Sequence, residues 1–242
     1  MDLKKVGDGE VVLIAGGDKI YTDIAARFVG SDRELQEIIA SPFNKNIVKN
    51  IIDSGHEAAL EFDYFIFGVA GYSRVTEVQL VRKRIASYMI KSGRVDKDEH
   101  EFSLILPPTI NPNSNVEING EKIPLKEVLK GLEKWYNEYP APDEDLRYLK
   151  PQATEFKGII GMNAHALRDW FRIRCCLNAQ EEIRDMANKM LRLCKKAAPS
   201  LFEDAGANCV RMGYCPENDF QHPSCKVIKK KDALEIIKNN EV

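Results

Sequence analysis

Cationic and hydroxyl side chains are concentrated in one short stretch of the chain, residues 79–94. We expect a helix in its first half and a turn rich in polar groups in its second half, which ends in Ser92-Gly93-Arg94. A hydroxyl, free backbone N–H groups and a guanidinium suit a phosphate. The stretch therefore favours a small-anion site, with a solvated basic surface as the alternative, since most charge runs are solvated. It holds five cations and two serines but no Asp or Glu: Arg82, Lys83, Arg84, Lys91, Arg94, Ser87 and Ser92.

The order of residues in this stretch resembles the signature of the flavin-dependent thymidylate synthases, Arg-His-Arg-x-x-Ser-x-Asn-Glu-x-Ser-x-Arg. Residues 82–94 read RKRIASYMIKSGR, so all three Arg and both Ser of the signature are present. Lys83, Met89 and Ile90 stand where the family has His, Asn and Glu. Gln79 agrees with a family Gln three residues before the signature.

This resemblance implies two neighbouring binding surfaces. Arg82, Lys83 and Arg84 would contact the flavin, and Arg82 would also reach the substrate. Ser92 and Arg94 would hold the nucleotide phosphate from a neighbouring subunit. The residues that the signature assigns to the substrate are Gln79, Arg82, Ser92, Gly93 and Arg94.

A second segment, Gly55-His56-Glu57 followed by Glu61, also carries chemistry. A lone His after a Gly is usually a capping or surface residue, although its near-neutral pKa suits it to other roles. The segment resembles the one that precedes the family signature, at nearly the same distance from it. The resemblance implies that His56 lies at the flavin and Glu61 near it.

A third group of residues lies further along the chain. Arg147 precedes Pro151 by four residues, Asn163-Ala164-His165 stands where the family has Asn-Ala-Arg, and Arg174 follows on the same expected helix. In isolation these are ordinary surface residues. The resemblance implies that Asn163 and His165 contact the flavin, and that Arg147 and Arg174 bind the nucleotide. A guanidinium can pair bidentately with a phosphate or a uracil edge, and we assign Arg174 to the charge that develops on the uracil ring.

Composition narrows the possible partners. A net charge of −2 and a pI of about 6.2 provide no bulk attraction to nucleic acid. No apolar run approaches the length of a membrane span, and the N-terminus lacks the apolar region of a signal peptide. We therefore expect a cytoplasmic protein with neither a nucleic-acid partner nor a membrane partner.

The six cysteines show no pattern of a secreted disulfide framework, so we expect reduced thiols. Cys209, Cys215, His222 and Cys225 lie close together in the tail, but the close Cys pair of most zinc sites is missing. We therefore predict no metal.

Hydrophobic periodicity and turn residues predict the elements that position these groups. Apolar side chains on both faces of residues 61–71 indicate a strand inside a covered sheet. Val78, Val81 and Ile85 are expected to form the core stripe of the helix that Ser73 begins. We expect strands at 11–15, 61–71 and 102–106, a hairpin at 116–123 around Asn119-Gly120, and helices at 31–40, 46–53, 124–138, 143–149, 161–175, 178–196 and 232–239.

With strands early and in the middle and long helices late, the pattern favours one α+β or α/β domain whose sheet is covered by helices. The resemblance implies a mostly antiparallel central sheet, as in the thymidylate synthase-complementing proteins. We expect a single domain over residues 1–242, with a hairpin insertion at 107–124 and a cysteine-containing tail at 208–242.

The resemblance also implies an activity, the reductive methylation of dUMP to dTMP. It implies FAD, NADPH and methylene-tetrahydrofolate, and a homotetramer whose subunits share their sites. A diverged paralogue that binds a nucleotide or flavin without methylating is the second hypothesis, because Lys83, Met89, Ile90 and His165 alter the pattern. A nucleic-acid-binding helix over residues 82–91 is the third.

Overall fold

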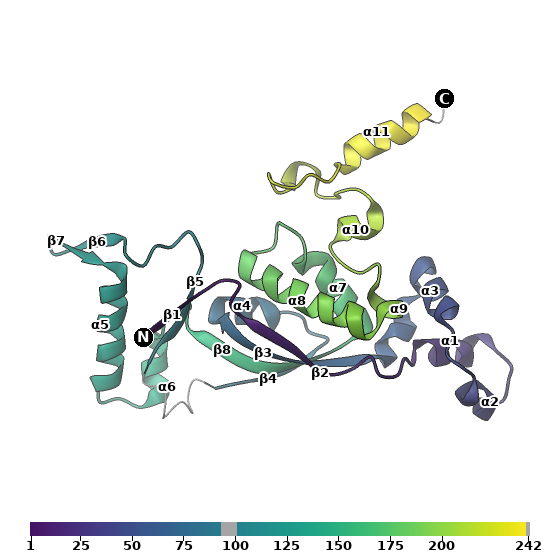
Figure 1. Ribbon diagram of the computed structural model, residues 1–242, viewed down its shortest axis with the longest axis horizontal. Helices are drawn as coiled ribbons and strands as arrows, with labels where there is room; N and C mark the ends of the chain where they lie inside the picture. The colour runs from purple at the N-terminus through teal and green to yellow at the C-terminus, as the bar shows by residue number, and fades with distance from the viewer. Residues whose placement is uncertain (93–100, 241–242) are drawn as a thin grey trace. The chain divides into compact units, whose positions relative to one another are not determined.

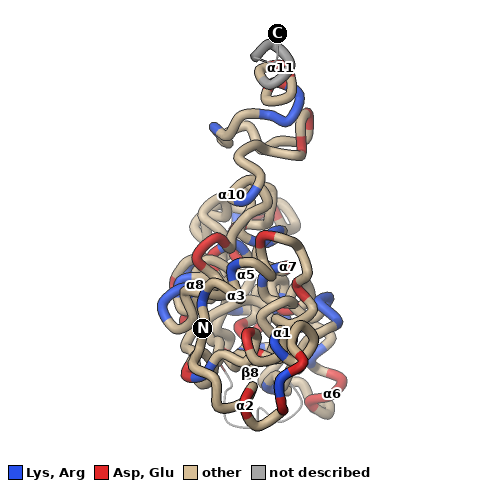
Figure 2. The backbone as a smooth tube through the Cα atoms, turned by 90° about the vertical axis from the view of Figure 1, so that its right-hand side faces the viewer, with Lys and Arg blue, Asp and Glu red and all other residues tan. Residues whose placement is uncertain are grey.

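The computed structural model describes residues 1–92 and 101–240, and it has the mixed helix and strand content that the sequence predicts (Figure 1). None of the helices in these ranges is long and apolar enough to cross a membrane. In the view of Figure 2, Lys and Arg are interspersed with Asp and Glu along the backbone rather than gathered in one block.

The described residues divide into two compact units, which between them contain every element named below. Whether the chain behaves as a single folding domain stays a prediction. The first unit comprises Met1–Glu10, Val69–Arg82 and Tyr88–Ile159, and the second comprises Val11–Gly68, Lys83–Ser87 and Ile160–Val242.

One four-stranded sheet has the strand order β2-β3-β8-β4. At one end of the β3–β8 pair the Ala164 N–H donates to the Asp63 carbonyl (2.7 Å), and at the other the Arg74 N–H donates to the Thr154 carbonyl (2.9 Å). The start of β3 thus lies beside the end of β8, so these strands are antiparallel. The strands are β2 (Glu10–Ala15), β3 (Tyr64–Ser73), β4 (Ser87–Ile90) and β8 (Glu155–Asn163).

Helices of the second unit pack on one another and on the buried face of β3. Phe65 and Phe67 are fully buried, and Phe65 meets Phe202 edge-on with ring centroids 5.2 Å apart. α7 and α8 lie side by side (Figure 1). This unit contains α1 (Thr22–Gly30), α2 (Leu35–Ala40), α3 (Lys45–Ser54), the 3₁₀ helix η1 (Glu57–Phe62), α7 (Ala164–Arg174), α8 (Glu181–Ala197), α9 (Pro199–Phe202), α10 (Asn208–Met212), η3 (Asn218–Phe220) and α11 (Lys230–Asn240).

The other face of β3 differs from the expectation of a strand covered on both sides. Tyr64 is 46% exposed, and Ile14, which packs over Gly68, is 55% exposed. Only the Phe65 and Phe67 side is buried in this chain. The sequence pattern correctly identifies the apolar residues on the second face, but Tyr64 and Ile14 stay exposed among the residues that the structure describes.

The first unit pairs β1 with β5 in parallel, from Asp2 beside Ser103 to Lys5 beside Leu106. Phe102 and Tyr136 pack edge-on in its small core, with ring centroids 5.3 Å apart. The unit also contains β1 (Asp2–Lys5), α4 (Arg74–Leu80), β5 (Ser103–Leu106), β6 (Asn115–Ile118), β7 (Glu121–Pro124), α5 (Leu125–Glu138), α6 (Asp143–Leu146) and the 3₁₀ helix η2 (Arg147–Leu149).

Glu155 of β8 connects β1, β5 and β3 of the first unit through hydrogen bonds. Its carboxylate accepts hydrogen bonds from Lys4 Nζ (2.6 Å), Ser103 Oγ (2.6 Å) and the Gly71 N–H (2.9 Å). Burial by itself would raise the pKa of Glu155, but the bonds from Lys4, Ser103 and Gly71 outweigh it and lower the pKa below the ordinary value.

We expect Glu155→Gln to lower the free energy of unfolding at neutral pH by roughly 1–3 kcal/mol, the worth of hydrogen bonds to a charged group. A lowered pKa in the folded state stabilises the protein above the ordinary carboxyl pKa, and this contribution is lost as the pH falls through the lowered value. Denaturant unfolding of both proteins as a function of pH measures the difference.

The matched control is Glu117→Gln, because Glu117 is exposed on β6 of the same unit. A stability gap between Glu155→Gln and the unaltered chain that stays constant down to strongly acidic pH would contradict the assigned role of the charge.

Candidate functional site

The basic stretch is shaped differently from the expected helix. α4 ends at Leu80, residues 81–86 form turns, and β4 begins at Ser87. Val78, Val81 and Ile85 are 49%, 42% and 63% exposed, so the predicted core stripe is wrong. Thr76 and Leu80 are buried instead.

Two interactions explain why this helix stops early. The Tyr88 hydroxyl donates to the Leu80 carbonyl (2.9 Å), which occupies a carbonyl at the helix end. The Lys91 N–H donates to the Lys157 carbonyl (2.9 Å), because the stretch after the turn pairs with β8. Tertiary pairing thus outweighs the local helical pattern.

The cations of the signature are placed on this turn. Arg82 and Arg84 are exposed, whereas Lys83 is half-buried and lies 3.6 Å from Asp169 of α7. Gln79 and Ser92 are half-buried and have polar partners. Gly93 and Arg94 lie outside the described residues, so their predicted roles stay predictions.

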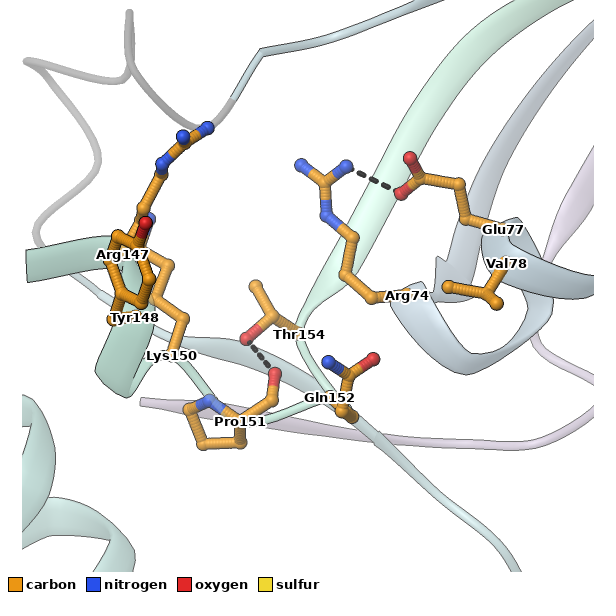
Figure 3. Close-up of a pocket in the computed structure, with 9 residues that line it drawn as sticks. All are labelled: Arg74, Glu77, Val78, Arg147, Tyr148, Lys150, Pro151, Gln152 and Thr154. Atoms are coloured by element: carbon orange, nitrogen blue, oxygen red, sulfur yellow. Dashed lines mark hydrogen bonds and ion pairs between the residues drawn. The ribbon is translucent and has the colours of Figure 1, made fainter. Parts of the chain in front are cut away.

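The first unit contains a cavity of about 460 Å³ that includes Arg147 (Figure 3). Arg74 and Lys150 are its other cations. The Arg74 guanidinium donates to Glu77 Oε2 (2.5 Å) and to the Lys91 carbonyl (3.2 Å). The cavity is lined by Arg74, Glu77, Val78, Arg147, Tyr148, Lys150, Pro151, Gln152 and Thr154.

Arg147 lines this cavity with hydrogen-bond donors that no described residue uses. It belongs to η2, which follows the acidic first turn of α6, and its Nε donates to the Glu144 carbonyl (3.1 Å). Among the described residues its two terminal nitrogens have no hydrogen-bond partner. The cavity is lined by three cations, Arg74, Arg147 and Lys150, and by one carboxylate, that of Glu77. This excess of positive charge suits a phosphate.

The second unit brings together most of the residues predicted for the flavin. His56 and His165 line one cavity of about 460 Å³. His165 Nδ1 lies 3.3 Å from Glu61 Oε1. Asn163 immediately precedes α7, the helix that carries His165. Its Oδ1 accepts a hydrogen bond from the Ala166 N–H (2.7 Å) and so caps the N-terminus of α7. The lining residues are Gly55, His56, Glu57, Ala58, His165, Arg172 and Arg211.

Glu57 is the centre of this cluster, a role that the sequence did not predict for it. Its side chain is 7% exposed, and it accepts two hydrogen bonds from Arg172 Nη2 (2.9 and 3.0 Å) and one from Arg211 Nη1 (3.0 Å). Arg168 Nη2 and His165 Nε2 each lie 3.9 Å from the carboxylate. A buried carboxylate with this many cations is costly to remove, because its partners would be left unpaired.

The Glu57 cluster continues into a cavity of about 310 Å³ beside α10. Arg168 forms a bidentate pair with Asp204 at 2.7 and 2.9 Å. The hydrogen bond from Arg168 lowers the pKa of Asp204, although burial opposes this shift. The arginines of α7 therefore have charged partners in Glu57 of η1 and in Asp204, which follows α9.

Arg174 is the last residue of α7, half-buried and with polar partners. It lies in the second unit, whereas Arg147 lies in the first. The predicted meeting of Arg94, Arg147 and Arg174 around one nucleotide therefore stays a prediction.

All six cysteines carry free thiols. In residues 1–92 and 101–240, no group of three or more His, Cys, Asp or Glu side chains is already arranged to hold a metal ion. Burial raises the pKa of Cys175 to about 12, so this thiol is protonated at neutral pH.

Comparison with known proteins adds to this geometry. The sequence model of the family described as "Thymidylate synthase complementing protein" matches residues 14–200. A flavin-dependent thymidylate synthase of Nitratidesulfovibrio vulgaris is 38% identical over 178 residues, which cover 71% of this chain and 72% of the relative. One of Clostridium tetani is 36% identical over 217 residues, covering 84% and 86% of the two chains.

A solved structure has a similar fold. It is a UMP/dUMP methylase, PolB from Streptomyces cacaoi, bound with 5-Br dUMP, with a TM-score of 0.66 and 18% identity. The match covers 84% of this chain and 96% of that one. At this identity the likeness concerns the fold, and it confirms the predicted α+β class with its helix-covered sheet.

Proposed function

The chain belongs to the thymidylate synthase complementing protein family, and from this premise we propose that it converts dUMP to dTMP by flavin-dependent reductive methylation. The observation that carries the proposal is the family match over residues 14–200. This range contains every lining residue of the Arg147 cavity and all of those of the His56 and His165 cavity except Arg211. The protein is therefore an enzyme, a methyltransferase that acts on a pyrimidine nucleotide.

The proposed phosphate site is the cavity of Arg74, Arg147 and Lys150. Its three cations fit a dianionic phosphate, and so do the terminal nitrogens of Arg147, which have no hydrogen-bond partner within residues 1–92 and 101–240. Gln79 on α4, Arg82 after it, and Ser92, Gly93 and Arg94 complete the proposed nucleotide site.

The proposed flavin site is the cavity of His56 and His165, with Glu61 orienting His165. Imidazole and guanidinium donors fit the polar edge and the diphosphate of FAD. Arg82, Lys83, Arg84 and Asn163 are its further proposed contacts. When bound, the flavin supplies the redox chemistry of the reaction.

The reaction needs a one-carbon donor and a reductant, for which we propose methylene-tetrahydrofolate and NADPH. Methylation at C5 requires negative charge to develop on the uracil ring. We propose that Arg174 stabilises this charge, since a fixed guanidinium acts strongly in a site from which water is excluded.

We also propose a cytoplasmic homotetramer with shared sites. The apolar sheet face of the second unit supports association, because Val12, Ile14 and Tyr64 are 44%, 55% and 46% exposed there. Six free thiols suit a reducing compartment.

The second hypothesis, a paralogue that binds without methylating, rests on four replaced residues, of which three lie in the signature and the fourth is His165. Lys83 pairs with Asp169, Met89 is 76% exposed, and Ile90 packs against Gly158. The amide and carboxylate of the family signature are thus replaced by apolar groups on β4.

A purified sample decides between the two. We expect a yellow protein with about one flavin per chain, and NADPH oxidation that requires both dUMP and methylene-tetrahydrofolate. A colourless protein that binds dUMP but oxidises no NADPH would establish the paralogue instead.

A further inference from the structure

The tail that follows α9 has almost no hydrophobic core of its own. From Ala207 to Ile236 the only buried side chain among those described is that of Cys215, which is 4% exposed. Short segments with so little burial rarely keep one conformation unless a disulfide or a metal holds them. The tail nevertheless contains three of the six cysteines.

Hydrogen bonds bring this tail to the end of α7, where Cys176 lies. Arg172 of α7 and Arg211 of α10 both donate to Glu57, which sets α10 and its Cys209 beside the end of α7. Asn178 Nδ2 donates to the Phe220 carbonyl (2.9 Å), which joins the loop after Cys176 to the tail.

Further hydrogen bonds fold the tail back on itself around Cys215. The Cys215 N–H donates to the Ile228 carbonyl (2.7 Å), and the Lys230 N–H donates to the Cys215 carbonyl (2.9 Å). Cys225 is three residues before Ile228, at a turn where its N–H donates to the His222 carbonyl (2.9 Å). Four segments that each carry one cysteine are therefore neighbours.

The electrostatics of Cys209 agree with this arrangement. Burial raises the pKa of Cys209, and negative charge on Cys176, Cys225 and Cys215 raises it further. The other two cysteines are not among the groups that shift the pKa of Cys209. Cys175 lies near Lys195 of α8 as well as its neighbour Cys176, and Cys194 is buried on α8.

We propose that Cys176, Cys209, Cys215 and Cys225 form a tetrathiolate metal site that fastens the C-terminal tail to α7. Four thiolates suit Zn²⁺ in tetrahedral geometry, and the same ligands can hold an iron–sulfur cluster. His222 is not a ligand in this site, because its Nδ1 accepts the Ser224 N–H (3.1 Å) within the turn. Residues 176 and 209–225 would then bind a soft metal that the proposed methylation does not use.

Metal binding in this site is coupled to ordering of the tail. Since no ready-made group of three metal ligands is present in the described residues, the four thiols close on the ion and release their protons to solvent. The tail should therefore be protected from proteases when the metal is bound and open to them when it is removed.

The test uses the full chain purified without chelators. Elemental analysis should find about one zinc per chain, or iron with the visible absorption of a cluster. Cys209→Ser and Cys215→Ser should each lower the metal content at least about tenfold. The matched control is Cys175→Ser, which changes the thiol next to Cys176 and should retain the metal.

Limited trypsin digestion supplies a second readout that does not depend on a variant folding. Treating the unaltered protein with a strong chelator should accelerate cleavage in the Lys226–Lys231 region, and adding zinc back should reverse it. The proposal is overturned if the purified protein contains neither metal, if Cys175→Ser and Cys209→Ser retain equal amounts, or if chelation leaves the cleavage rate unchanged.

Discussion

Replacing Arg174 with Ala lowers kcat for dUMP methylation by about 10²- to 10³-fold, the usual cost of removing one donor that stabilises transition-state charge. Arg174 ends α7, and its half-buried position limits the water that could replace it. Arg174→Lys should recover only part of the loss, because an ammonium lacks the planar fork of a guanidinium. Single-turnover assays with flavin-loaded enzyme measure the effect.

The matched control for this experiment is Arg192→Ala. Arg192 is exposed on α8, the helix beside α7, so its loss should leave kcat unchanged. Circular dichroism establishes that both variants fold. If Arg174→Ala turns over at the rate of the unaltered enzyme, Arg174 has no place in the mechanism.

Replacing Arg147 with Ala raises the KM for dUMP by roughly 10- to 150-fold, with a smaller change in kcat. This is the effect of losing a charge-assisted contact worth about 1.5–3 kcal/mol. The contact binds the phosphate equally in the ground state and the transition state, so its loss appears mainly in KM. Steady-state kinetics at saturating NADPH and methylene-tetrahydrofolate separate the two parameters.

Lys134→Ala is the control for charge alone, because Lys134 is an exposed cation on α5 of the same unit. An equal rise in KM for both variants would mean that general attraction, and not the cavity of Arg147, binds the nucleotide.

Much of the fold follows from local patterns in the sequence. The Asn119-Gly120 pair forms the expected hairpin turn, with φ of 53° and 84°, and joins β6 to β7. Gly55 ends α3 in the left-handed conformation, as its place after the apolar pattern predicts. The periodic apolar residues of 124–138 form α5.

The errors arise where long-range pairing decides the structure. Residues 155–163 form β8, although a helix was expected from Gly161, because this segment pairs with β3 and β4. β1 was not predicted, since its pairing with β5 joins residues about a hundred positions apart. The short strand β4 replaces the polar turn expected after Ile85 for the same reason.

The site residues also divide into those that the sequence identifies and those that only long-range contacts bring together. The grouping of His56, Glu61 and His165 in the second unit follows from the family resemblance, not from any local pattern. Glu57 was missed because its partners Arg172 and Arg211 are 115 and 154 residues away, and nothing near them signals the pairing. Arg74 was missed for a similar reason, since only the fold brings it to Arg147.

Calorimetric titration of the flavin-loaded protein with dUMP and with deoxyuridine tests the central claim most directly. If Arg74, Arg147 and Lys150 hold the phosphate, dUMP binds about 100-fold more tightly than deoxyuridine, and Arg147→Ala removes most of that preference. Equal affinity for the two ligands, or a preference that survives Arg147→Ala intact, would contradict the account.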